Sequence, residues 1–418
     1  MKKILILFIA MMAGLPTIAQ EFDVSLQLRP RFEFRNGYKT LLEQGQDATS
    51  FVSQRSRLKL NFSNEKLLLK FSAQNIRVWG DVPTMTTSDK NGIAVFEAFG
   101  TYAVSPGFSL SLGRQVLSYD NQRIFGEVDW AQQGQSHDAA LLSWLPVENQ
   151  RLDLGFALNS DKENLFDTPY QVNNYKNMQF AWYHLDFNTS GISILALNTG
   201  YEFPVSDSNR EIQYLQTAGS YYKFNGNNFS GDLYGYVQVG EKANRNLEAW
   251  NLGGIINYKI SENWGIAAGA EYLSGTDMGT TSEELQSFTP LFGTNHAFNG
   301  FMDYFYVGNH QNSVGLQDFY GKINYTSGKF KLSAIPHVFY SAADIQDPGF
   351  SKMDSYLGTE IDITGNYKVN DMFSIAMGYS QMFGTNSLEI LKGGDANRTQ
   401  NWAWLAVNFN AGLFSTSK

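Results

Sequence analysis

The chain of 418 residues contains no cysteine, which excludes a disulfide scaffold and a thiolate metal site. Its net charge of −9 gives no general electrostatic basis for nucleic-acid binding. After residue 19 no apolar run approaches the roughly 20 residues of a membrane-spanning helix, and no long helical periodicity appears, which disfavours an α/β enzyme. Aromatic residues are abundant instead, at 15%, and this profile is typical of many strands joined by polar loops.

The first 19 residues have the form of a secretory signal. Lys2 and Lys3 precede an apolar stretch over residues 4–15, and small residues end at Ala19. We expect cleavage after Ala19, because the apolar stretch is too short for an uncleaved spanning anchor. The mature chain, residues 20–418, is then either soluble outside the inner membrane or crosses a membrane as a barrel, because only helices and closed barrels satisfy every backbone group in lipid.

Residues 22–35, FDVSLQLRPRFEFR, alternate strictly between apolar and polar side chains. A period of two predicts a β-strand, and the run exceeds the roughly 9–11 residues that cross a bilayer at a tilt. One face is apolar and the other carries arginines, which suits a strand with lipid on one side and a water-filled lumen on the other. The alternative for this stretch alone is an edge strand of a soluble sandwich.

The same alternation repeats to residue 414 and gives about 18 strands. Tight turns alternate with longer segments, of which residues 119–137 and 276–314 are the longest. This layout predicts an all-β, antiparallel up-and-down transmembrane barrel with short periplasmic turns and long extracellular loops, in the outer membrane of a Gram-negative bacterium. The last strand ends in Phe414, close to the aromatic end that barrel-assembly machinery reads, although four residues follow it.

Arginine is concentrated in the first third of the chain, mostly on the polar faces of the expected strands. We interpret these residues as a cationic, anion-binding strip lining a pore, because the guanidinium fork grips carboxylates and keeps its charge. The alternative is that they only neutralise Glu33, Glu97, Asp120 and Asp129. The pore-lining set is Arg29, Arg31, Arg55, Arg57, Lys59, Arg77, Arg114 and Arg123.

Two irregular blocks carry a family resemblance. The first spans residues 113–138 and includes Gly113-Arg114-Gln115, Asp129-Trp130 and His137-Asp138. The second is FTPLFGTNHAFNGFMDYFYVGN, residues 288–309. The chain resembles the alginate export family of outer-membrane barrels in both blocks. It departs at Gln135, where many relatives have an arginine, which weakens the case for strong anion selectivity at that point.

The resemblance implies a monomeric barrel of 18 strands whose lumen conducts an anionic polysaccharide or a related anionic or sugar solute. It places Arg114, Arg123, Asp129 and Asp138 in a constriction network, to which we add Glu97. It also implies that the loop with His296, Asp303 and Tyr304 folds toward the lumen. The lipid bilayer and the assembly machinery are the other expected partners.

Metal binding and catalysis are not expected. His296, Asp303 and His310 match no ligand spacing, so we predict neither a metal nor another cofactor. His137, His184 and His337 have no evident serine partner, so we predict no enzyme. Two hypotheses remain beside a barrel hydrolase: a passive channel with an arginine-lined lumen, and a barrel plugged by residues 276–314 that serves as a surface binding or structural protein.

Overall fold

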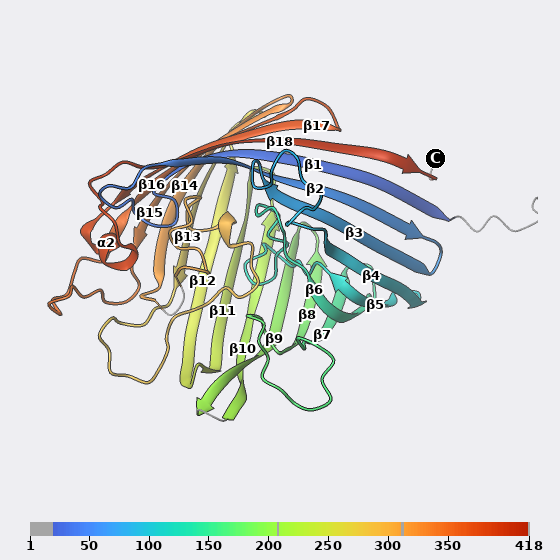
Figure 1. Ribbon diagram of the computed structural model, residues 1–418, viewed down its shortest axis with the longest axis horizontal. Helices are drawn as coiled ribbons and strands as arrows, with labels where there is room; N and C mark the ends of the chain where they lie inside the picture. Colours follow the sequence, from blue (N-terminus) through green and yellow to red (C-terminus); the bar gives the residue numbers. More distant parts are fainter. Residues whose placement is uncertain (1–19, 207–208, 311–312, 417–418) are drawn as a thin grey trace, which may run out of the picture.

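The computed structural model describes residues 20–206, 209–310 and 313–416, so the expected signal at residues 1–19 lies outside the described part. Its strands form one antiparallel sheet in which each strand pairs with its neighbours along the chain and β1 pairs with β18, closing a barrel (Figure 1). The strands are β1 (Glu21–Asn36), β2 (Thr49–Ser63), β3 (Leu67–Val78), β4 (Ala94–Ser105), β5 (Phe108–Gln115), β6 (His137–Trp144), β7 (Gln150–Leu158), β8 (Asn177–Phe187), β9 (Ser190–Ser206), β10 (Asn209–Asn225), β11 (Phe229–Lys242), β12 (Arg245–Lys259), β13 (Trp264–Leu273), β14 (Leu316–Ser327), β15 (Phe330–Tyr340), β16 (Tyr356–Lys368), β17 (Phe373–Gly384) and β18 (Gln400–Ser415).

The predicted all-β barrel of 18 antiparallel strands is therefore confirmed. Two short helices, η1 (Asn295–Ala297) and α2 (Asn386–Lys392), occur in loops. No helix among the described residues has the length and apolar character needed to cross a membrane.

Side chains alternate between an apolar outer wall and a polar or packed interior. On β9, Ser193 is fully buried inside, whereas the neighbouring Ile194 is 54% exposed outside. Aromatic pairs such as Phe229 with Tyr258 and Trp264 with Tyr325 line the outer wall at the short-turn rim, with ring centroids 4.8 and 4.7 Å apart. Such a girdle is typical of the membrane–water interface of outer-membrane barrels.

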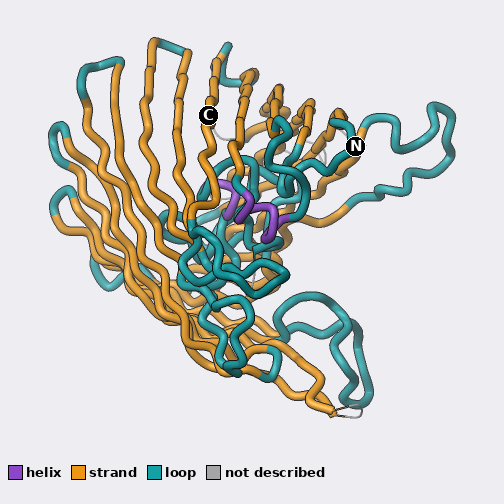
Figure 2. Tube along the Cα trace, turned by 90° about the vertical axis from the view of Figure 1, so that its left-hand side faces the viewer, coloured by secondary structure: helices purple, strands orange, loops and turns teal. Residues whose placement is uncertain are grey.

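Two long loops on the opposite rim fold into the barrel rather than away from it. The first inward loop is residues 116–136, between β5 and β6, and the second inward loop is residues 274–310, which leads toward β14. Figure 2 shows loops gathered on the inner side of the curved wall of strands. The loops join each other through backbone hydrogen bonds, including Gly126 N to Phe292 O at 2.8 Å and Thr294 N to Gln122 O at 2.9 Å.

Candidate functional site: an arginine strip and the loop that covers it

The first two strands bring five arginines together on the inner wall. Arg29 lies directly opposite Arg55 in the β1–β2 register. On β2, Arg55 and Arg57 are 1% and 4% exposed, whereas Leu58 on the outer face is 37% exposed. We call this set the arginine strip; it consists of Arg29, Arg31, Arg35, Arg55 and Arg57. Lys59 follows Arg57 on the same inner face, as the period of two predicts.

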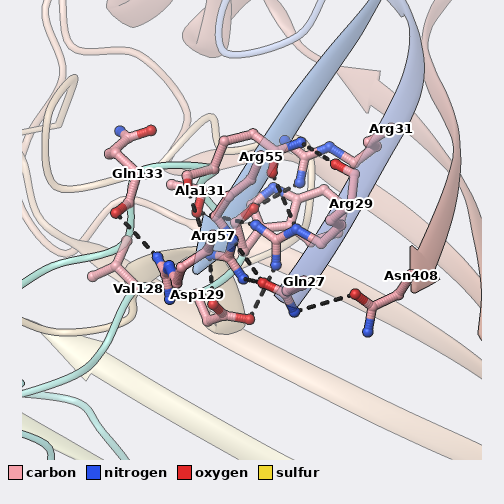
Figure 3. A network of polar contacts seen from close by, with 12 residues as sticks. Gln27, Arg29, Arg31, Arg55, Arg57, Val128, Asp129, Ala131, Gln133 and Asn408 are labelled. Carbon is pink, nitrogen blue, oxygen red and sulfur yellow. Dashed lines mark hydrogen bonds and ion pairs between the residues drawn. The ribbon is translucent and has the colours of Figure 1, made fainter. Parts of the chain in front are cut away.

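Residues 128–133 of the first inward loop, which we call the covering segment, lie against the strip (Figure 3). The carboxylate of Asp129 bridges two strands, accepting from Arg29 at 3.0 Å and from Arg55 at 2.8 Å. Backbone carbonyls of the segment accept further hydrogen bonds from four guanidinium groups of the strip. These bonds run from Arg31 to Trp130 O at 2.7 Å, from Arg29 to Ala131 O at 3.3 Å, from Arg55 to Gln132 O at 3.4 Å and from Arg57 to Gln133 O at 3.5 Å.

Neutral amides fix the orientation of the buried guanidinium groups. The side-chain oxygen of Gln27 accepts two bonds from Arg55 at 2.9 and 2.6 Å, and that of Gln74 accepts two from Arg57 at 2.8 and 2.6 Å. Gln132 accepts from Arg29 at 3.1 Å and donates to Ser53 at 3.0 Å. Amides supply acceptors without charge, so they orient the strip and leave it positive. These glutamines were not predicted from the sequence, although Gln27 shares the phase of Arg29.

The carboxylates around the strip are few. Glu33 accepts from Arg31 at 2.9 Å and from Arg35 at 2.8 Å, and Trp402 of β18 donates to it at 3.2 Å. Asp129 is the other carboxylate ion-paired with the strip among the described residues. Burial alone would raise the pKa of Asp129, but Arg55 and Arg29 outweigh it and lower that pKa below its ordinary value. Five guanidinium groups thus face two carboxylates, which leaves a local excess of positive charge.

Trp130, at the tip of the first inward loop, connects the strip to the second inward loop by stacking. The guanidinium of Arg31 lies 3.9 Å from the ring centroid of Trp130. His296 also stacks on Trp130, at 4.5 Å with an interplanar angle of 14°, and Phe301 stacks on His296 at 5.5 Å. This row of planar groups leads from the wall at β1 into the second inward loop.

The second inward loop is held by its own polar contacts. Asp303 receives hydrogen bonds from Tyr38 and, at 2.8 Å, from the His296 ring. Burial, followed by the charge of Asp303, raises the pKa of Tyr38 well above its ordinary value, so the phenol stays a donor. Tyr304 donates to Gly37 O, and the backbone of Met302 donates to Glu360 of β16 at 2.7 Å.

Arg123 ties both loops to the far wall. It donates to both oxygens of Glu271 on β13 at 2.7 and 2.9 Å. Its remaining donors reach Asn295 at 3.0 Å and Asn299 at 2.9 Å, and the ring of Phe298 lies 4.5 Å away. Arg123 is 1% exposed, so its donors serve loop docking. This differs from the expectation that Arg123 contacts a solute.

The strand register locates three further residues of the predicted set and corrects two of them. Arg77 pairs with Gln54, one step out of phase with Arg55, and forms an ion pair with Asp89 of the adjacent loop. Arg114 and Asp138 lie opposite each other, 2.7 Å apart, on the outer face that also carries Leu112, which is 53% exposed. Arg114 and Asp138 therefore do not belong to the lumen network, whereas Arg77 lines the same rim cavity as Arg31 and Arg35. Glu97 does face inward, where Lys70 contacts it at 2.9 Å and Ser72 at 3.1 Å.

One histidine has a serine neighbour that the sequence did not indicate. The Nδ1 atom of His184 lies 2.8 Å from Ser193 Oγ, and its Nε2 atom lies 3.1 Å from Asp186. Ser193 has no exposed surface, so its hydroxyl is not accessible to a substrate in this arrangement. No group of three metal-ligating side chains occurs within the described ranges.

Cavities lie on both sides of the paired loops. A cavity of about 500 Å³ opens toward the long-loop rim; we call it the vestibule, and its lining includes Arg31, Arg35, Lys39, Tyr38 and Trp130. Gln132 and Gln133 of the covering segment also line it. A second cavity of about 450 Å³ lies toward the short-turn rim, lined in part by Asp120, Trp182 and Lys223. The first inward loop therefore contributes to both cavities, through Trp130 in the vestibule and Asp120 in the second cavity.

Comparisons with known proteins agree with this architecture. The family model described as Alginate export matches residues 20–401. The outer membrane protein OpdK of Pseudomonas aeruginosa is similar in structure, with a TM-score of 0.64 at 12% identity, covering 94% of this chain and 98% of that one. OccAB4 of Acinetobacter baumannii gives 0.64 at 11% identity over 94% and 98% of the two chains. A BenF-like porin from Pseudomonas fluorescens Pf-5 gives 0.62 at 13% identity over 94% and 99%.

A search of curated proteins finds no match. The structural likenesses show the fold, and the family match extends over almost all of residues 20–418. A closed barrel with an apolar outer wall is the form that crosses an outer membrane. The chain is an integral outer-membrane β-barrel that belongs to the alginate export family.

Proposed function

We propose that the chain is a passive outer-membrane channel for anionic solutes, including sugar acids and anionic polysaccharide, with the arginine strip as the selective element. The observation that carries the proposal is the excess of guanidinium over carboxylate on the inner faces of β1 and β2. A cluster of fixed positive charge between low-dielectric walls attracts anions and excludes cations.

The vestibule supports this assignment. Arg35 and Lys39 line it beside Tyr38, with their charged groups 4.2 and 5.6 Å from the Tyr38 ring centroid. Cations next to an aromatic face suit a solute that combines a carboxylate with a ring, because the ring can stack while the carboxylate pairs. The long loops carry the vestibule, and by the usual orientation of such barrels they face the outside of the cell.

The proposal is tested by reconstituting the full-length chain in planar bilayers and measuring reversal potentials in a KCl gradient. We expect the wild type to prefer chloride and the double variant Arg55→Ala/Arg57→Ala to lose most of that preference. The matched control is Lys259→Ala/Lys368→Ala, which also removes two positive charges but at the short-turn rim, where each lysine pairs with a carboxylate at 2.8 or 2.7 Å. Cation preference in the wild type, or equal effects of both double variants, contradicts the proposal.

A plugged barrel that acts as a surface binding protein is the second candidate. The specific observation in its favour is the bidentate pair of Arg123 with Glu271, which fixes the joined loops to the wall. This candidate expects no conductance in the wild type and conductance after deletion within residues 276–310. The fully buried Ser193 favours either candidate over a barrel hydrolase.

A further inference from the structure

The covering segment presents oxygen atoms to the arginine strip in the way that an anionic solute would. Asp129 places one carboxylate oxygen on Arg29 and the other on Arg55, at 3.0 and 2.8 Å. Carbonyl oxygens of residues 130–133 occupy the neighbouring donors. Both distances to Asp129 are close to those of charge-assisted hydrogen bonds between guanidinium groups and carboxylates, which a solute carboxylate can form equally well. The strip is therefore an anion site whose present occupant is part of the chain.

The occupant is open to competition from the lumen. Asp129 has a side chain 48% exposed, although Arg55 beneath it is 1% exposed. The side chain of Arg29 keeps 12% exposure, so an arriving anion can reach one guanidinium of the site before the segment leaves the strip. Ser53, 8% exposed, lies under the segment and accepts a hydrogen bond from Gln132 at 3.0 Å, so its surface reports whether the segment is in place.

The backbone of the covering segment is held in an unfavourable conformation. Val128, directly before Asp129, has φ of +51°. A β-branched residue rarely adopts a left-handed backbone, and such strain costs on the order of 1–3 kcal/mol. The contacts of Asp129 with the strip offset this cost. When another anion takes over those contacts, the strain favours departure of the segment.

The vestibule leads to this point. Arg31 and Arg35 line the cavity, and Arg29, Arg55 and Arg57 continue the same inner face beneath the covering segment. Positive charge therefore extends from the open cavity to the covered part of the wall. An anion that moves from the vestibule along these arginines therefore reaches the covering segment.

We propose that Asp129 is a tethered counter-ion, a resident carboxylate that occupies the anion site of Arg29, Arg55 and Arg57 and exchanges with the carboxylate of a passing solute. This inference rests on the proposed channel function and adds its regulation. The exchange keeps the buried guanidinium groups paired, because one carboxylate replaces another, and it avoids the cost of an unpaired buried charge. A neutral solute does not displace Asp129.

The test uses the absence of cysteine in the chain, which makes a single introduced thiol a clean reporter. Ser53→Cys is placed in the full-length chain in liposomes, and its modification rate by a membrane-impermeant maleimide is measured with 100 mM glucose, acetate or D-glucuronate. The control thiol is Ser111→Cys, on the inner face of β5, equally 8% exposed and bonded to Thr101.

We expect acetate and D-glucuronate, but not glucose, to accelerate modification of Ser53→Cys and to leave Ser111→Cys unchanged. Asp129→Asn is expected to raise the Ser53→Cys rate about tenfold without any added anion, since a charge-assisted hydrogen bond contributes about 1.5 kcal/mol. Asp129→Glu retains the carboxylate and is expected to keep the rate low.

The inference is overturned if Ser53→Cys reacts at one rate in glucose and in both carboxylates, or if Asp129→Asn leaves that rate unchanged. These outcomes are separate from failure of the channel proposal, because thiol modification requires no current. An anion-selective barrel with an unresponsive Ser53→Cys rejects the exchange alone. A barrel without anion preference whose Ser53→Cys still responds rejects selective transport and keeps the displaceable segment.

Discussion

Arg123 and Glu271 form a bidentate ion pair, with nitrogen–oxygen distances of 2.7 and 2.9 Å, between a loop and the opposite wall of the barrel. Both side chains are almost fully buried, at 1% and 3% exposure. Asn295 and Asn299 complete the coordination of the guanidinium, so two loops and one strand meet at this one group. The position of the covering segment depends on this anchor, because Arg123 lies in the same loop.

Arg123→Met is expected to destabilise the folded barrel by about 3–5 kcal/mol, because it leaves the buried carboxylate of Glu271 without its cation. The measurement is equilibrium unfolding in urea with detergent-solubilised protein. Arg123→Met/Glu271→Leu is expected to recover much of the loss. Arg210→Met, which removes the partly exposed pair with Glu202, is the control and is expected to cost less than about 1 kcal/mol. Equal effects of Arg123→Met and Arg210→Met contradict the anchoring role.

Trp130→Ala is expected to increase single-channel conductance, because it removes the ring that contacts both Arg31 and His296 and so weakens the hold on the covering segment. A cation–π contact of a desolvated arginine is worth about 2 kcal/mol. Trp130→Phe retains a ring and is expected to lie between the wild type and Trp130→Ala. Conductance that is the same in all three proteins speaks against closure by this stack.

Arg114→Ala is expected to leave ion selectivity unchanged, since Arg114 faces outward beside Asp138. The reversal potential should match the wild type within experimental error, whereas Arg57→Ala should shift it toward cations. A shift of comparable size for Arg114→Ala disproves the assignment of Arg114 to the outer face.

The docking of α2 is expected to depend on pH. Burial lowers the pKa of Lys392 to about 7, and its ammonium donates to Asn309 O at 2.8 Å. Burial, followed by the charge of Lys392, lowers the pKa of the adjacent His310 to about 3. Because both groups bind fewer protons in the docked state than when exposed, docking strengthens from about pH 3 to 6.5 through His310 and from about 7 to 10.4 through Lys392.

Limited proteolysis within residues 385–399 measures this effect, and cleavage at pH 6 should exceed cleavage at pH 9 when rates are corrected for the protease. Lys392→Met removes the basic-range dependence and is the matched control. Equal protection of wild type and Lys392→Met at both pH values excludes titration of Lys392 as its cause.

The strands could be predicted because the alternation of apolar and polar residues that specifies them is a property of neighbouring residues in the sequence. Residues 22–35 alternate at every step, and the structure places β1 at Glu21–Asn36. The same counting assigns Arg29 and Arg55 to one face. It also assigns Arg114 to the face of Leu112, two residues earlier, but the resemblance to a constriction motif had suggested the lumen. At Arg114 the alternation of apolar and polar residues predicted the outer face correctly, and the family resemblance did not.

The inward loops could not be predicted in the same way, because their contacts join residues far apart in the chain. Arg29 and Asp129 are separated by 100 residues, and Arg123 and Asn299 by 176. No periodicity encodes such pairs. Irregular aromatic blocks at residues 113–138 and 288–309 indicated loops with fixed structure, but not which wall each one meets.

The pairing of β1 with β18 sets when the charged wall becomes ordered during biogenesis. Glu33, which orients Arg31 and Arg35, receives a hydrogen bond from Trp402 on β18, the strand that closes the barrel against β1. The seam of the cylinder therefore runs beside its most charged strand. A chain truncated before residue 400 lacks both the closing strand and the indole that holds this carboxylate, so the charged wall is complete only after the two ends of the sheet have met.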